Sequence, residues 1–316
     1  MSQLKHDDNF KYIPNATTIT NERLDMFPNV KFFFEMLVKD TKIESKHVGR
    51  SFQYDESVEK NRYFSAHGLF MDYFIRKHLS NQYNIKIKDM RTEIILENSD
   101  NYFIRTDEKL QNAIKEHYEI FKDSNSKAMD IIKSIKTVSQ SHLIYFRYDL
   151  PKSDYTVNEN NLREIIRYLE RLPYSMVHLN PYLGCNYFNA DADLIFDNDV
   201  IYEIKTSKFK SLTRDEFIIP SSKFYQTIIY GFGFYKATGI KVKRFKIYNP
   251  LLGDEYSIEL DNIDFELFEK VLKRDVAIYS RYKDLIINEM IFDFSLFNEV
   301  KDEKKNLLHV DKKLMS

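Results

Sequence analysis

Two short β-type runs that carry acidic residues restrict what this chain can fold into more than any other feature. Residues 191–208 read DADLIFDNDVIYEIKTSK, and residues 197–199, which favour a tight turn, separate two apolar stretches. Side chains alternate across a strand, so a three-residue loop places Asp193 opposite Glu203, with Cβ atoms about 4.5–5.5 Å apart. A two-residue loop would instead place Leu194 opposite Glu203. We therefore predict an antiparallel hairpin whose odd-length loop brings the two acids together.

The paired acids in turn predict a metal site. Two carboxylates this close repel each other, and burying them unpaired is costly. A divalent cation resolves the conflict, because Mg²⁺ favours oxygen ligands from one or two carboxylates, waters and phosphates. Lys205 shares a strand face with Glu203, so we expect its amine to hold or deprotonate an attacking water, with a pKa depressed beside the cation. Asp191 shares the face of Asp193 and is either a further ligand or an ion-pair partner of Lys205.

The rest of the chain predicts a mostly helical region followed by alternating strands and helices. The helix that begins near residue 160 has Asn160 or Asn161 as its predicted cap, and Gly239 closes another helix. The predicted helices cover 28–39, 61–79, one or two segments within 107–139, 160–171, 220–237 and 264–283. The predicted strands outside the hairpin cover 174–180, 242–250 and 255–260. The strands are therefore concentrated in the second half of the chain.

Composition excludes several classes of protein. The formal net charge of −1 provides no overall positive field, so a nucleic-acid partner would need a local basic patch. The single cysteine, Cys185, excludes an internal disulfide and a four-thiolate zinc or iron–sulfur site, and we interpret it as a packing residue. No apolar leader and no membrane-length apolar run occur, so we expect a soluble, intracellular, cytoplasmic protein with no membrane partner. The abundance of Lys, Asn, Ile, Tyr and Phe favours an AT-rich genome, such as that of a virus or phage.

The hairpin and the following helix resemble a known family. Asp193, followed after nine residues by Glu203-Ile204-Lys205, is similar to the D…(D/E)xK core of the PD-(D/E)XK nucleases. The triplet ExK occurs four times in the chain, but only this copy has apolar β-formers on both sides and an acidic strand before it. Gln226 and Tyr230 form a QxxxY element, which is typical of the RecB-type branch with its lambda-type and CRISPR-associated exonucleases. Gly184 stands nine residues before Asp193, whereas a glycine in that branch often immediately precedes the acid.

The resemblance implies a fold and a division of the chain. The expected fold is α/β and restriction-endonuclease-like, a mixed sheet flanked by helices with a helical N-terminal elaboration. Residues 1–150 would form the mostly helical N-terminal region, with helix 61–79 contributing to the nuclease core. Residues 151–283 would form the core itself, and residues 284–316 a charged C-terminal segment.

The resemblance also implies roles for individual residues. Asp193, Glu203 and the Ile204 carbonyl would bind Mg²⁺ or Mn²⁺, and Lys205 would orient the attacking water. Gln226 and Tyr230 lie at i and i+4 and so project from one helix face, where they would complete the catalytic set. Phosphate contacts would come from residues after the ExK strand and from the same helix, namely Thr206, Ser207, Lys208 and Lys223. For Lys223 the alternative is an ordinary solvated lysine on the helix surface.

An upstream helix offers a further candidate ligand. The family often has an acid or a histidine there, and Asp72 is the acid in HGLFMDYFIRKHL. An ordinary i,i+4 ion pair between Asp72 and Arg76 is the alternative. Whether His67 joins the site stays open, and we expect it and His78 to be surface residues.

These inferences predict a metal-dependent nuclease that hydrolyses DNA phosphodiester bonds. The alternative is a non-catalytic nucleic-acid-binding or scaffolding protein that retains the nuclease fold. The sequence does not distinguish exonuclease from endonuclease or single-stranded from double-stranded DNA, and it does not exclude RNA. Sequence specificity, pathway and oligomeric state also stay open.

Overall fold

A single mixed sheet forms the centre of the molecule. The computed structural model describes residues 10, 12–22, 24–39, 41–51, 53, 64–97, 108–145, 156–206 and 221–288. Within this part of the chain, six strands pair in the order β1-β6-β5-β4-β3-β2. The strands are β1 (Glu44–His47), β2 (Val177–Leu179), β3 (Leu194–Phe196), β4 (Val200–Ile204), β5 (Arg244–Asn249) and β6 (Asp254–Glu259). Strands β4 and β5 are parallel, and every other neighbouring pair is antiparallel.

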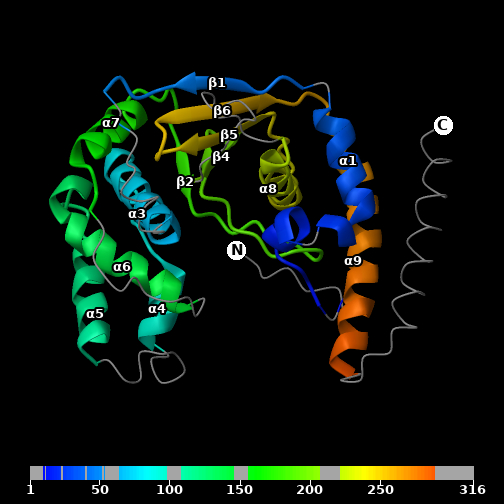
Figure 1. Cartoon of the computed structure of the whole chain (residues 1–316), viewed down its shortest axis with the longest axis horizontal. Coiled ribbons are helices and arrows are strands. Elements are labelled where there is room, and N and C mark those ends of the chain that lie inside the picture. Colours follow the sequence, from blue (N-terminus) through cyan, green and yellow to red (C-terminus); the bar gives the residue numbers. More distant parts are fainter. Residues whose placement is uncertain are drawn as a thin grey trace.

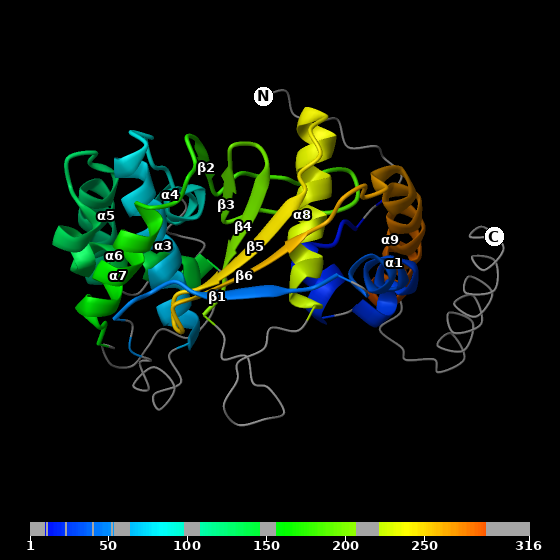
Figure 2. The same ribbon diagram turned by 90° about the horizontal axis from the view of Figure 1, so that it is seen from above.

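Helices cover both faces of this sheet (Figures 1 and 2). The α-helices are α1 (Pro28–Val38), α3 (Phe64–Gln82), α4 (Met90–Glu97), α5 (Glu108–Lys122), α6 (Ile132–Tyr145), α7 (Glu159–Leu169), α8 (Lys223–Thr238) and α9 (Phe265–Asn288). Short helical turns are η1 (Thr18–Glu22), η2 (Leu24–Met26) and η5 (Ala128–Ile131). Among the described helices, none has the length and apolar character needed to cross a bilayer.

The alternation of side chains along the strands creates two hydrophobic cores. Val200 and Tyr202 of β4 belong to the core shared with α3, α5, α6 and α7. Ile201 of the same strand belongs to the core shared with α1, α8 and α9. Figure 2 shows the resulting three layers, with α3 to α7 on one side of the sheet and α8, α1 and α9 on the other. The expected α/β class, a mixed sheet flanked by helices, is confirmed.

Most predicted elements are present; the departures are the cap of α7 and two elements that the sequence did not indicate. Asn158, rather than Asn160 or Asn161, caps α7, and its side chain accepts from the backbone N–H groups of both. The segment 107–139 contains two helices, α5 and α6, joined through η5. Strand β1 and helix α4 were not predicted. Gly239 closes α8 with a φ of 76°, as expected for a glycine in the left-handed region. The division into three regions stays a prediction, and most of segment 284–316 lies outside the described residues.

Candidate active site

The β3–β4 hairpin has the predicted three-residue loop. Phe196 pairs with Val200 and Leu194 with Tyr202, so residues 197–199 form the loop, and Asp193 and Glu203 stand next to the last pair. The backbone N–H of Asp193 donates to Glu203 Oε1 at 3.1 Å. The backbone N–H of Ile204 donates to Asp193 Oδ2 at 2.7 Å. Each acid is thus held by the backbone of the other strand, and the prediction that the hairpin brings them together is confirmed.

Glu203 faces helix α8. Ile201 of β4 lies in the core on the α8 side, and Glu203 is two residues further along the same strand face. Glu203 is only 1% exposed. A carboxylate buried this deeply needs charged or hydrogen-bonding partners, because an unpaired buried charge is costly.

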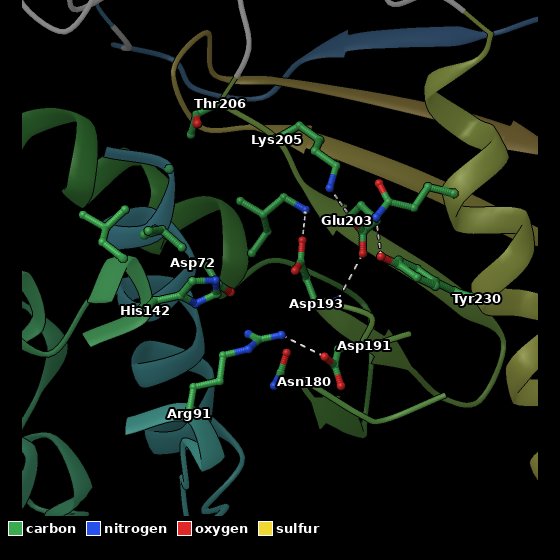
Figure 3. A pocket seen from close by; sticks show the side chains of 15 residues that line it. Asp72, Arg91, His142, Asn180, Asp191, Asp193, Glu203, Lys205, Thr206 and Tyr230 are labelled. Atoms are coloured by element: carbon green, nitrogen blue, oxygen red, sulfur yellow. Dashed lines mark hydrogen bonds and ion pairs between the residues drawn. The ribbon is translucent and has the colours of Figure 1, made fainter. Parts of the chain in front are cut away.

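Lys205 supplies one such partner. Its Nζ lies 2.6 Å from Glu203 Oε2 (Figure 3). Burial lowers the pKa of Lys205, but the charges of Glu203 and Asp193 outweigh burial and raise that pKa above its ordinary value. The depression expected beside a bound cation stays a prediction. Burial and the charge of Glu203 also raise the pKa of Asp193.

The predicted ion pair between Lys205 and Asp191 is wrong. Asp191 does not pair with this lysine, because its Oδ2 lies 2.8 Å from Nη2 of Arg91 on helix α4. Arg91 was not predicted as a site residue. Asp191 therefore holds a guanidinium at the edge of the site.

Helix α8 brings the two QxxxY residues to the acids. Gln226 Nε2 donates to the Tyr230 hydroxyl and to Thr17 Oγ1, the latter at 3.2 Å. Burial, together with the charges of Glu203 and Asp193, raises the pKa of Tyr230 well above its ordinary value. The phenol therefore stays protonated and remains a hydrogen-bond donor. Lys223, one turn earlier, is half-buried and is not among the described residues that line the cavity.

Helix α3 contributes Asp72 from the opposite side. Arg76 donates to both oxygens of Asp72, at 3.0 and 2.7 Å, so the expected i,i+4 pair is present. Asp72 nevertheless lines the same cavity as Asp193 and Glu203. Burial raises the pKa of Asp72 to about 6 although the Arg76 guanidinium lowers it. His67 is 2% exposed, so the prediction that it is a surface residue is wrong, and it is not among the residues that line the cavity.

A glycine lets α3 approach the end of β4. A Cβ at Gly68 would lie only 2.5 Å from Thr206 Oγ1. Thr206 lines the cavity, and its contact with substrate stays a prediction. Ser207 and Lys208, the next two predicted contacts, lie outside the described residues.

These side chains surround an open cavity of about 390 Å³ (Figure 3). Its lining includes three residues that sequence patterns did not indicate, Arg91, His142 and Asn180. Burial and the charge of Arg91 lower the pKa of His142 to about 3, so its imidazole is neutral at physiological pH. The three residues come from α4, α6 and the end of β2, and no spacing in the sequence links them to the hairpin.

The charge of the lining fits a divalent cation. Four carboxylates line the cavity against two cationic side chains, Arg91 and Lys205. Asp193 and Glu203 each retain acceptor lone pairs beyond the bonds described above. Within the described residues, no group of three or more His, Cys, Asp or Glu side chains is arranged to hold a metal by itself. A site of two carboxylates completed by a carbonyl, water and phosphate matches Mg²⁺ better than zinc.

Comparison with known proteins adds no relative. No protein-family model, curated protein or solved structure matches this chain significantly.

Proposed function

We propose that this protein is a Mg²⁺- or Mn²⁺-dependent nuclease that hydrolyses phosphodiester bonds of DNA. The observation that carries the proposal is the convergence of Asp193, Glu203 and Lys205 from two adjacent strands on one cavity. Carboxylates repel phosphate, so a protein that only binds nucleic acid gains nothing from burying two of them there. The geometry thus favours catalysis over the binding or scaffolding alternative.

Asp193 and Glu203 would hold the cation, with the Ile204 carbonyl as a third ligand and Asp72 bordering the same space. When bound, the cation would lower the pKa of a water molecule and offset negative charge on the phosphate. The backbone bonds that fix Asp193 and Glu203 keep their oxygens in place before substrate arrives, which reduces the reorganisation required.

The remaining residues would orient the reactants. Lys205, protonated beside Glu203, would position the attacking water and stabilise a phosphate oxygen. Tyr230 keeps its proton and would donate to a second phosphate oxygen, while Gln226 fixes its hydroxyl. Thr206, Lys223, Ser207 and Lys208 would contact phosphates of the DNA backbone next to the cleaved bond.

The test is cleavage of labelled DNA. Linear and circular, single- and double-stranded substrates are incubated with Mg²⁺, with Mn²⁺ or with EDTA. We expect cation-dependent cleavage that Asp193→Asn, Glu203→Gln and Lys205→Ala each reduce by at least about 100-fold. Asp199→Asn is the matched control, because this half-exposed acid lies in the loop of the same hairpin and pairs with Arg244.

Two results would overturn the proposal. One is the absence of cleavage of any substrate with either cation, by protein whose fold is verified by circular dichroism. The other is cleavage that the three site variants leave at the level of Asp199→Asn. Retained DNA binding in the first case would favour the binding alternative.

A further inference from the structure

An exposed aromatic residue lies opposite one of the residues that line the cavity. Tyr182 is 59% exposed and lies opposite Asp191 in an isolated antiparallel bridge. Backbone bonds on either side, from Leu183 N to Ala190 O at 2.8 Å and from Ala192 N to Pro181 O at 3.2 Å, hold the two segments together. Side chains of directly opposed residues project to the same face, and their Cβ atoms lie about 4.5–5.5 Å apart. Asp191 lines the cavity, so Tyr182 lies opposite a lining residue, and its ring extends from there over Gly184, outside the lining itself.

The ring is held in place from behind. A Cβ at Gly184 would overlap the hydroxyl and ring carbons of Tyr182, so the ring rests directly on the backbone of this glycine. The Tyr182 hydroxyl donates to Asn189 Oδ1 at 2.9 Å. One part of the ring is thus covered and fixed while most of it faces solvent. A preorganised ring loses little conformational entropy when a ligand stacks on it.

Polar groups connect the ring with the candidate catalytic residues. Arg91 and Asn180 line the end of the cavity next to Asp191, and Figure 3 shows the three side chains gathered there. A guanidinium favours phosphate, and an amide can donate to a phosphate or to a base edge. A strand that passes from the ring to Lys205 would therefore meet an aromatic surface, a cation and the candidate catalytic residues in turn.

From this arrangement we propose that Tyr182 is a stacking platform for an unpaired nucleobase. The cavity would then take single-stranded DNA, because the bases inside a duplex are already covered on both faces. Stacking on aromatic side chains is the usual way in which single strands are held without sequence preference. The identity of the ligand as DNA rests on the proposed nuclease function, whereas the ring, its support and its exposure do not.

The test compares binding of a single-stranded oligonucleotide with binding of the same backbone carrying abasic sugars. Fluorescence anisotropy in EDTA measures affinity without cleavage. We expect Tyr182→Ala to weaken binding of the normal strand by about 5- to 150-fold and to leave the abasic strand unchanged. Tyr182→Phe keeps the stacking surface and should stay within about threefold of the wild type.

Two further variants separate stacking from folding. Gly184→Ala retains the tyrosine but displaces its ring, so it should reproduce the loss seen with Tyr182→Ala. Met36→Ala is the matched control, because it removes another exposed apolar side chain, at 56% exposure, from helix α1, which contributes no residue to the cavity lining. Thermal melting verifies that each variant is folded.

The outcomes distinguish this inference from the nuclease proposal. If folded Tyr182→Ala binds the normal strand as well as the wild type does, or if the wild type binds the abasic strand equally well, the platform is refuted. Cleavage that depends on Lys205 would then still support the nuclease proposal without the platform. If the wild type prefers the normal strand and loses that preference in Tyr182→Ala, the platform stands even when no substrate is cleaved.

Discussion

Replacing Lys205 by methionine tests the electrostatic balance of the site, because the side chain keeps its length and loses its charge. At the observed 2.6 Å between Lys205 Nζ and Glu203 Oε2, an effective dielectric constant of about 20 gives a gross attraction of about 6 kcal/mol. Desolvation of the ammonium offsets several kcal/mol of this, and 28% exposure of the lysine lets water screen the pair. Breaking a buried pair usually costs about 3–5 kcal/mol, so we expect Lys205→Met to lower the free energy of unfolding by about 2–4 kcal/mol near pH 8.

The loss should depend on pH in a defined direction. The pKa of Asp193 is already raised in the folded protein, and the charge of Lys205 lowers it. Removing Lys205 therefore raises the folded pKa of Asp193 further above its unfolded value. Between the unfolded and the folded pKa, this carboxyl group is protonated in the folded protein and ionised in the unfolded chain. The free energy of unfolding therefore falls as pH rises through that window. The deficit of the variant should be largest near pH 8 and smallest near about pH 4.

Urea denaturation in EDTA at these two pH values measures the deficit. Lys236→Met is the matched control, because Lys236 pairs with Glu269 at 2.9 Å with both side chains about one-third exposed. Such a surface pair contributes about 0–1 kcal/mol. A Lys205→Met deficit no larger than that of the control, or an equal deficit at both pH values, would refute the electrostatic account.

Three further predictions follow from the same contacts. Asp193→Asn should stabilise the cation-free protein at neutral pH, because a buried carboxylate and its repulsion by Glu203 are removed. We also expect Mg²⁺ to raise the melting temperature of the wild type and not that of Asp193→Asn; thermal melts with and without the cation check both. Gly68→Ala should cost about 1–3 kcal/mol in urea denaturation, because its Cβ would lie 2.5 Å from Thr206 Oγ1; adding Thr206→Ala should recover most of that loss, and no recovery would contradict the contact. Cys185 should react with a chromogenic disulfide only slowly at neutral pH until denaturant is added, because burial raises the pKa of its thiol to about 11.

Local signals in the sequence account for the parts of the fold that were predicted. Pro28 at the start of α1, Gly239 at the end of α8 and residues 197–199 between two apolar runs each restrict the backbone directly. Strand β1 carries no such signal, because Glu44–His47 is polar throughout and exposed on both faces at the edge of the sheet. Its place in the sheet depends on the pairing with β6, which is a long-range contact.

The candidate site divides in the same way. Asp193, Glu203 and Lys205 could be predicted together because strand alternation and one loop length determine their relative positions. Arg91 and His142 could not, because they reach the cavity only through the packing of α4 and α6 beside the sheet. The predicted pairing of Asp191 with Lys205 is wrong for the same reason. Lys205 is the nearer cation in the sequence, whereas the actual partner, Arg91, is a hundred residues away.

That packing depends on a buried ion-pair network, which makes the helices on one face of the sheet part of the site. Arg76, 1% exposed, donates to Asp72 and lies 3.5 Å from Asp89. Asp89 accepts the backbone N–H of Thr92 at 2.8 Å and so holds the first turn of α4, from which Arg91 reaches the cavity. Removing the guanidinium would leave two carboxylates without their cationic partner, at a cost of about 3–5 kcal/mol. The same change would release Asp72 at one wall and the turn that carries Arg91 at the other, so the opposing walls of the cavity are expected to weaken together.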